Sequence, residues 1–272
     1  METNVEIPRR AVVVLSGGQD STTCLYWALA AGYEVHAVTF DYGQRHAVEI
    51  EAAKRVARRA GVASHEFITL GPILKGTSPL VSGAPLAQYE SHAVLPGGLE
   101  KTFVPMRNQL FLTIAANRAY VLGANILITG VCEEDFGGYP DCRREFISAL
   151  EHASSLGTFT GQDGALPALH ILTPLMHLSK ADSVHLAIAI TEACYAALAW
   201  THTSYDGQYP PTGKDHATLL RAKGFEEAGV PDPLVLRAWM GGLMELPSAR
   251  GYEPAVVNEY IRRLNAHNWL EA

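Results

Sequence analysis

The chain has 272 residues, of which 48% are hydrophobic and 18% charged, and its formal net charge is −7. This composition excludes an intrinsically disordered chain, and the acidic balance argues against a broad nucleic-acid-binding surface. No apolar run approaches the roughly 18 residues of a transmembrane helix, and the first ten residues lack the apolar core of a secretory signal. We therefore expect a cytoplasmic enzyme that acts on a small molecule.

The first predicted strand is the apolar run at residues 12–15, which leads directly into the sequence Ser-Gly-Gly-Gln-Asp-Ser at residues 16–21. Gly17 and Gly18 allow a tight turn and a close approach of the main chain to an anion. A helix predicted over residues 21–31 follows, and the N–H groups at a helix N-terminus attract phosphate. The pattern indicates a phosphate-binding loop, with an ordinary glycine turn as the alternative.

Asp20 or Ser21 is expected to cap this first helix. The loop lacks the lysine and the spacing of the Walker motif, and it also lacks the Gly-x-Gly-x-x-Gly pattern of dinucleotide-binding proteins. Those two classes of nucleotide-binding protein are therefore excluded.

Strand-like and helix-like runs alternate along the rest of the chain. We expect strands near residues 12–15, 34–40, 65–69, 126–131 and 169–172, and helices over residues 21–31, 47–60, 108–122, 143–155 and 179–191. This order predicts an α/β fold with a Rossmann-like, five-stranded parallel sheet and helices on both faces. Residues 71–100, rich in Gly, Pro and Ser, are expected to form a long loop beside the site.

Four further segments follow predicted strands or the long loop, where ligands of such sheets bind. They are VTFDYGQRH at residues 38–46, TFVPMRN at 102–108, GVCEEDFGGYPDCR at 130–143 and TPLMHLSKAD at 173–182. The SGGQDS loop resembles the pyrophosphate loop of the ATP pyrophosphatases. With the four segments, the chain resembles the 7-cyano-7-deazaguanine synthase family over about residues 12–223.

The resemblance implies that ATP adenylates the carboxylate of 7-carboxy-7-deazaguanine, releasing pyrophosphate, and that ammonia then forms an amide and a nitrile. It implies catalytic roles for Asp20, Lys180, Arg107 and Arg45 and a role for Asp20 in binding Mg²⁺. ATP would contact Ser16, Gly17, Gly18, Gln19, Asp20, Ser21, Phe40, Tyr42, His46 and Lys180. On the residues alone, a solvated surface lysine is the alternative for Lys180, and a structural ion pair is the alternative for either arginine.

The planar deazaguanine calls for an aromatic ring to stack on it and a carboxylate to accept from its guanine-like edge. The expected substrate-binding residues are Gly130, Glu133, Asp135, Phe136, Gly138, Tyr139 and Asp141. Taken singly, Phe136 is equally a core residue and the acidic residues are equally solvated loop charges.

The chain departs from the family pattern at four zinc-binding cysteines. Ser204, Thr212, Asp215 and Thr218 stand at those positions. The three hydroxyl residues are poor zinc ligands, and Asp215 alone cannot hold a structural site that needs four donors. We therefore predict no family zinc site; a substitute site built from His202, Asp215 and His216 is the alternative.

Residues 225–272 continue past the usual end of the family, and their apolar residues recur at helical spacing. These are Leu234, Leu236, Trp239, Met240, Leu243 and Met244, then Val256, Val257, Tyr260, Ile261, Leu264 and Trp269. We predict two helices that pack over the former zinc region or form a dimer interface. The expected domains are an ATP pyrophosphatase domain at residues 1–200 and a mostly helical region at residues 201–272.

Three functions are compatible with these observations. The first is the family reaction, and the second is transfer of the adenylated acid to another amine, small or on a protein, stopping at an amide. The third is a non-catalytic ATP-binding scaffold, which the intact phosphate loop and Lys180 argue against. The resemblance also implies a homodimer.

Overall fold

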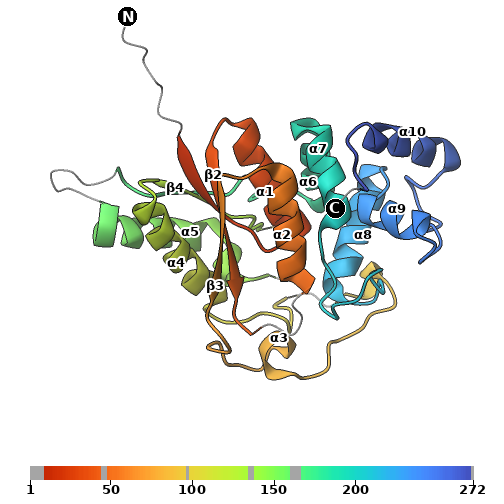
Figure 1. The fold of residues 1–272 in the computed structure, drawn as a ribbon. Coiled ribbons are helices and arrows are strands. Elements are labelled where there is room, and N and C mark those ends of the chain that lie inside the picture. Colours follow the sequence, from red (N-terminus) through yellow and green to blue (C-terminus); the bar gives the residue numbers. More distant parts are fainter. Residues whose placement is uncertain (1–8, 44–47, 96–97, 134–137, 160–166, 271–272) are drawn as a thin grey trace, which may run out of the picture.

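A computed structural model describes residues 9–43, 48–95, 98–133, 138–159 and 167–270 (Figure 1). At its centre is a five-stranded parallel sheet of order β3-β2-β1-β4-β5. The strands are β1 (Arg10–Val14), β2 (Glu34–Asp41), β3 (Ser64–Thr69), β4 (Ile126–Ile128) and β5 (His170–Leu172). The predicted parallel sheet is confirmed, and each predicted strand lies within a few residues of an observed one.

Alternate residues of β1 enter two separate cores. Val12 packs with α4 (Arg107–Val121) and α5 (Arg144–Ser154), whereas Val13 packs with α1 (Gln19–Ala30) and α2 (Val48–Ala60). Both valines are fully buried. Because β1 is covered on both faces, it has a continuous apolar sequence rather than an alternating one. The prediction of helices on both faces is confirmed.

The strand order places the site. From β1 the chain proceeds outward to β2 and β3, then crosses back to β4 and β5 on the other side of β1. The loops that leave β1 and β4 therefore diverge, and ligands of doubly wound sheets bind in the crevice at this switch point.

The long predicted loop is mostly irregular, and it contains a short helix α3 (Pro79–Ser82) and a 3-10 turn η1 (His92–Val94). It crosses toward the C-terminal region, where the N–H of Tyr89 donates to the carbonyl of Lys214 at 2.8 Å. Figure 1 shows the long loop that contains α3 passing below the sheet toward α8.

After β5 come α6 (Lys180–Ile190), α7 (Glu192–Ala197), η4 (Leu198–Trp200), α8 (His216–Ala228), α9 (Pro233–Met240) and α10 (Pro254–Asn265). Two short turns, η2 (Pro140–Cys142) and η3 (Ser155–Phe159), flank α5. Of these elements, α7 and α8 were not predicted. The α7 helix is short and buried around most of its surface, so it has no amphipathic pattern, and Gly224 interrupts the helical signal of α8.

The two predicted C-terminal helices exist as α9 and α10, but they do not bury all the residues expected. Leu236, Leu264 and Trp269 are buried in a core shared with α6 and α7. Trp239, Met240 and Leu243 are exposed, so these three residues do not pack over the former zinc region within this chain, and the alternative role in a dimer interface stays a prediction. The α9 helix ends at Met240, so the helical period does not extend to Leu243.

The predicted cap of α1 is also corrected. The helix begins at Gln19, with Gly18 in extended conformation as its N-cap and no side-chain cap. Among the described residues, no helix is long and apolar enough to cross a membrane.

Candidate active site

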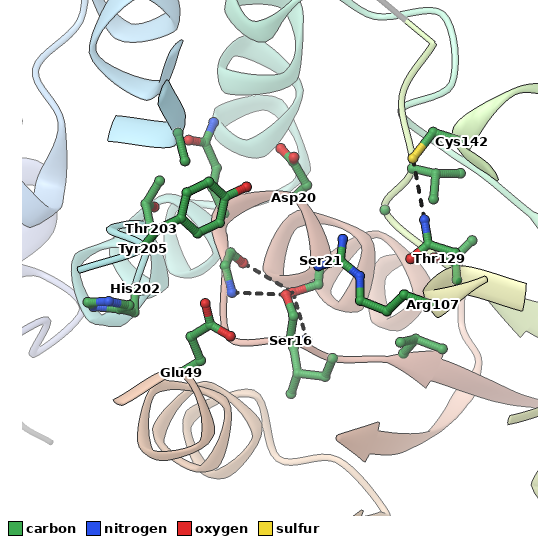
Figure 2. Close-up of a pocket in the computed structure, with 18 of the residues that line it drawn as sticks. Ser16, Asp20, Ser21, Glu49, Arg107, Thr129, Cys142, His202, Thr203 and Tyr205 are labelled. Atoms are coloured by element: carbon green, nitrogen blue, oxygen red, sulfur yellow. Dashed lines mark hydrogen bonds between the residues drawn. The ribbon is translucent and has the colours of Figure 1, made fainter. Parts of the chain in front are cut away.

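A pocket of about 350 Å³ opens where β1, β2 and β4 end (Figure 2). Of the predicted site residues, those that line it are Ser16, Gly18, Gln19, Asp20, Ser21, Phe40, Tyr42, Arg107, Gly130, Tyr139 and Lys180. The fold thus gathers into one pocket residues from five separate parts of the sequence.

The loop at residues 16–21 is held by its own serines. The Ser21 hydroxyl donates to the carbonyl of Gly18 at 3.2 Å and accepts from the N–H of Ser16 at 3.2 Å. The two serine hydroxyls lie 3.0 Å apart. These bonds shape the turn before α1, whose first N–H groups have no partner within the helix and can bind phosphate oxygens.

Gly17 is required by its contacts as well as by its backbone. Its φ is +85°, and a Cβ there would lie 2.4 Å from the carbonyl oxygen of Glu49 and 2.7 Å from the nitrogen of Ala53. Gly130 is constrained by its contacts alone, because a Cβ would lie 2.9 Å from the carbonyl carbon of Asp20. The loop is therefore clamped between the first turn of α2 and the end of β4.

Lys180 and Asp20 form an ion pair, with 2.7 Å between Nζ and Oδ2. Lys180 begins α6 directly after the N-cap Ser179, which forms a capping box with Asp182. Asp20 Oδ1 is buried and has no hydrogen-bond partner among the described residues. Ion pairing places a cation beside the phosphate loop and leaves one carboxylate oxygen of Asp20 available to a further positively charged group.

Arg107 is surrounded by phenol rings. Burial opposes its positive charge, but the neighbouring hydroxyls of Tyr42, Tyr205 and Tyr139 outweigh burial and raise the pKa of Arg107 above its usual range. Burial raises the pKa of all three tyrosines. The arginine therefore stays charged and the phenols stay neutral throughout the physiological pH range.

An aromatic wall stands on the β2 side of the pocket. The rings of Phe40 and Phe111 stack, with their centroids 4.3 Å apart and their planes at 6° to each other. The ring centroids of Tyr42 and Phe111 lie 5.2 Å apart. This wall offers a flat apolar surface to a planar ring.

Glu49 lines the pocket but was missed by the sequence analysis. Burial raises the pKa of its carboxyl group to about 7, against the opposing effect of Arg107. In sequence Glu49 resembles Glu51, an exposed helix residue two positions on, so nothing in the local pattern distinguishes the two.

The segment between η4 and α8 forms the opposite wall, with His202, Thr203, Ser204 and Tyr205 in the pocket lining. This wall was also missed. Figure 2 shows Glu49, His202 and Tyr205 on the side of the pocket opposite Arg107. The only sequence signal in this segment was the family's zinc pattern.

A buried arginine holds this wall in place. Arg221 donates to both carboxylate oxygens of Asp232, at 2.6 and 2.8 Å, and also to the hydroxyls of Thr201 and Thr203, at 2.7 and 2.8 Å. Both members of the ion pair are nearly inaccessible to solvent. Fully hydrogen-bonded buried ion pairs of this kind fix geometry, and removal of one partner is strongly destabilising.

The four positions expected to replace the zinc ligands lie in a hydrogen-bonded cluster. Ser204 Oγ lies 2.9 Å from Asp215 Oδ2 and 2.5 Å from Asp206 Oδ1, and Thr212 donates to Asp206. The N–H of Thr218 donates to Asp215 Oδ1, because Asp215 is the N-cap of α8.

This donor set does not fit zinc, because hydroxyls and one occupied carboxylate replace four thiolates. The alternative set is no better supported, since His202 Nε2 lies 2.7 Å from the carbonyl oxygen of Ser204. Within the described ranges, no three His, Cys, Asp or Glu residues are grouped so that they could hold a metal ion.

The remaining predicted residues lie elsewhere. Glu133 accepts from the N–H of Arg144, Gly138 packs on Gly98, and Asp141 accepts from the N–H of Asn108 at 3.4 Å; none of the three lines the pocket. Burial raises the pKa of Asp141. Arg45, His46, Asp135 and Phe136 fall outside the described residues. The roles expected for all of these residues stay predictions.

Comparison with known proteins identifies the family. The family model described as "Queuosine biosynthesis protein QueC" matches residues 10–229. The chain is 54% identical to a 7-cyano-7-deazaguanine synthase of Gloeobacter violaceus, over 83% of this chain and 95% of that protein. It is 50% identical to a 7-cyano-7-deazaguanine synthase of Chromobacterium violaceum, over 84% of this chain and 94% of that protein.

Among solved structures, a 4-thiouridine synthetase bound to RNA and ATP aligns with a TM-score of 0.45 and 17% identity. The alignment covers 97% of this chain and 52% of that one, and it is too distant to bear on function. The family match extends from β1 to the end of α8 and includes every described residue that lines the pocket. The chain belongs to the QueC family of queuosine biosynthesis proteins.

Proposed function

We propose that this protein is an ATP-dependent 7-cyano-7-deazaguanine synthase. It adenylates the carboxylate of 7-carboxy-7-deazaguanine, releases pyrophosphate, and uses ammonia to form the amide and then the nitrile. The observation that carries the proposal is the phosphate loop beside the Lys180–Asp20 pair, at the switch point of the sheet, in a chain of the QueC family.

The chemistry requires an activating nucleotide. A ring carboxylate does not react with ammonia at neutral pH because neither oxygen can leave. Transfer of AMP to one oxygen makes that oxygen a good leaving group, and pyrophosphate is released in the transfer. Both oxygens must depart before a nitrile can form, so each needs activation, and we expect two AMP for each nitrile.

The nucleotide phosphates bind over the start of α1, where helix N–H groups and serine hydroxyls converge. The residues we assign to ATP are Ser16, Gly17, Gly18, Gln19, Asp20, Ser21, Phe40, Tyr42 and Lys180. Lys180 neutralises charge on the departing pyrophosphate, and Arg107 supplies a second, permanently charged group across the pocket. The aromatic wall of Phe40, Tyr42 and Phe111 accommodates the adenosine.

The protein also offers a position for Mg²⁺. Asp20 Oδ1 is buried without a hydrogen-bond partner in the part of the chain that the structure describes, and Mg²⁺ is commonly held by one or two carboxylates together with substrate phosphates. Bound there, Mg²⁺ would neutralise charge on the phosphates. Zinc has no part in the proposal, because the hydrogen-bonded cluster around Asp215 does not fit it.

The deazaguanine lies between Gly130 and Tyr139 on one side and the wall at residues 202–205 on the other. Gly130 leaves room at the end of β4, and Tyr139 is fixed by a hydrogen bond of 2.7 Å between its hydroxyl and that of Thr102. The fixed phenol gives the ring a defined surface to lie against. The homodimer, the cytoplasmic location and the boundary near residue 200 stay predictions.

The test is to incubate the protein with ATP, Mg²⁺ and 7-carboxy-7-deazaguanine, with and without ammonium, and to follow AMP and deazaguanine masses. Nitrile formed only with ammonium is the expected result. An amide without nitrile would mean that the protein stops after the first activation. If neither AMP nor a changed deazaguanine is formed, the proposal is overturned.

A further inference from the structure

Glu49 lies against the phosphate loop. It belongs to the first described turn of α2, and its carbonyl oxygen is so close to Gly17 that no side chain fits between them. Its side chain points into the pocket, toward the space between Ser16 and the wall that carries His202 and Tyr205 (Figure 2). The position of the carboxylate is thus tied to the loop that holds the phosphates.

Among the described residues, one cation, two phenols and one imidazole surround the Glu49 carboxylate. Its charged and titratable neighbours are Arg107 from α4, Tyr42 after β2, and Tyr205 and His202 from the opposite wall. No hydrogen bond or ion pair joins the Glu49 side chain to another residue in the described parts of the chain.

Two other carboxylates near the site have a partner through at least one oxygen. Asp20 and Glu49 are the two acidic residues among those described as lining the pocket, and Asp20 is paired with Lys180. Asp215 accepts from Ser204 and from the start of α8. His202 is bonded to the carbonyl of Ser204, and burial lowers its pKa.

The proposed reaction needs a proton acceptor at this place. When ammonia attacks the acyl adenylate, a C–N bond forms, the C–O bond to AMP breaks, and the nitrogen must lose one proton. When the adenylated amide becomes a nitrile, the second C–O bond breaks with its electron pair on AMP, and the nitrogen loses its remaining protons.

We propose that the Glu49 carboxylate accepts the proton that the substrate nitrogen loses in the amide-forming and nitrile-forming steps. This inference rests on the proposed function and adds a catalytic residue to it. The proton passes to a carboxylate oxygen of Glu49 and then to solvent before the next transfer. A carboxyl group that titrates near neutrality, as burial makes Glu49, is suited to such a transfer.

The experiment separates activation of the acid from reaction of the nitrogen. Glu49→Gln keeps the size of the side chain and removes the base, and Glu51→Gln, on an exposed part of the same helix, is the matched control. Substrate-dependent exchange of pyrophosphate into ATP reports adenylation, and mass spectrometry reports amide and nitrile. Thermal unfolding establishes that both variants fold.

We expect Glu49→Gln to keep pyrophosphate exchange within about threefold of wild type and to slow amide formation by about 10²–10⁴-fold. Measured at a fixed concentration of unprotonated ammonia, the wild-type rate of amide formation should rise as pH increases through about 7. That rise should be absent from the residual rate of Glu49→Gln and present in Glu51→Gln.

Two results would overturn the inference while leaving the proposed function intact. One is an unchanged rate of amide formation in Glu49→Gln, and the other is an equal loss of exchange and amide formation, which would assign Glu49 to the binding of ATP. If the wild-type protein itself shows neither exchange nor product, the proposed function fails, and this inference fails with it.

Discussion

Lys180 and Asp20 act as one unit, because each compensates the charge of the other at 2.7 Å beside the phosphate loop. Lys180→Met would leave the Asp20 carboxylate without its cation and the pyrophosphate without a neutralising charge. We expect substrate-dependent pyrophosphate exchange to fall by about 10²–10³-fold, a size typical of losing one electrostatic contact in an active site. Lys54→Met, at an exposed ion pair, is the control, and equal exchange in both variants would refute the role of Lys180.

Glu49 gives a second prediction, for stability. Its pKa rises from 4.5 to about 7 on folding, so its contribution to stability is present below pH 4.5 and is lost as pH rises through about 7. At pH 8 the wild-type protein must bury an ionised Glu49 carboxylate, which costs stability, and Glu49→Gln removes that charge. We expect the variant to be more stable than wild type at pH 8 by about 1–3 kcal/mol, with a smaller difference at pH 4.5.

Chemical denaturation at the two pH values measures that difference. In Glu51→Gln no gain at pH 8 is expected, because hydrogen bonding and pairing with Lys54 lower the pKa of Glu51 instead. If the difference in stability between Glu49→Gln and wild type is the same at pH 8 as at pH 4.5, the surroundings of Glu49 do not raise its pKa.

At the residue scale, sequence reasoning found the residues that belong to recognisable patterns and missed those that do not. The phosphate loop was predicted from two glycines and a strand-to-helix transition. Glu49 has the pattern of a surface residue, and only the close approach of α2 to Gly17 turns it toward the pocket. Contacts of that kind depend on the packing of distant segments and leave no local signal.

Among the elements, the crossing of α6 and α8 depends on one glycine. A Cβ on Gly224 would lie 2.7 Å from the Cβ of Lys180. Gly224→Ala should therefore push α8 from α6, displace Lys180, and destabilise the protein by about 1–3 kcal/mol despite the better helix propensity of alanine. Thermal unfolding and pyrophosphate exchange measure the two effects.

Gly157→Ala is the matched control, because nothing lies within 4 Å of a Cβ at that position. We expect it to change neither the melting temperature nor the exchange rate appreciably. If Gly224→Ala behaves in the same way, the close contact of α8 with Lys180 does not determine the geometry of the site.

The hydrogen-bonded cluster around Asp215 yields an expectation for metal removal. Because hydroxyls and carboxylates are already bonded to one another there, a chelator should leave the melting temperature unchanged. Asp215→Ala should lower stability by about 1–3 kcal/mol, since it removes the cap of α8, leaves the N–H of Thr218 without its partner and takes away one of the two carboxylates beside Ser204.

Glu227→Ala, at an exposed position on the same helix, should be nearly neutral. A drop in melting temperature on treatment with chelator would mean that a bound metal supports this region after all. The elements here were the hardest to foresee from the sequence: α7 and α8 were missed because one is buried on most sides and the other contains Gly224, whereas the amphipathic α10 was predicted.

Across the whole molecule, the alternation of strands and helices predicted the parallel sheet but not its strand order, and the site lies at the predicted edge. The C-terminal helices could not be placed in the same way. Trp269 is buried in one core with Tyr195 of α7, and its carbonyl accepts from the indole of Trp200 at 2.6 Å. The region after residue 200 therefore shares its core with α6 and α7, which no local pattern reveals.

The central claim is that the carboxylate oxygens of the deazaguanine leave on AMP. The most direct measurement uses 7-carboxy-7-deazaguanine labelled with ¹⁸O in both carboxylate oxygens, together with ATP, Mg²⁺ and ammonium, and determines the mass of the AMP formed. We expect each AMP to carry one ¹⁸O, and two labelled AMP for each nitrile. Nitrile formed with unlabelled AMP, or with the label in pyrophosphate, would contradict the account.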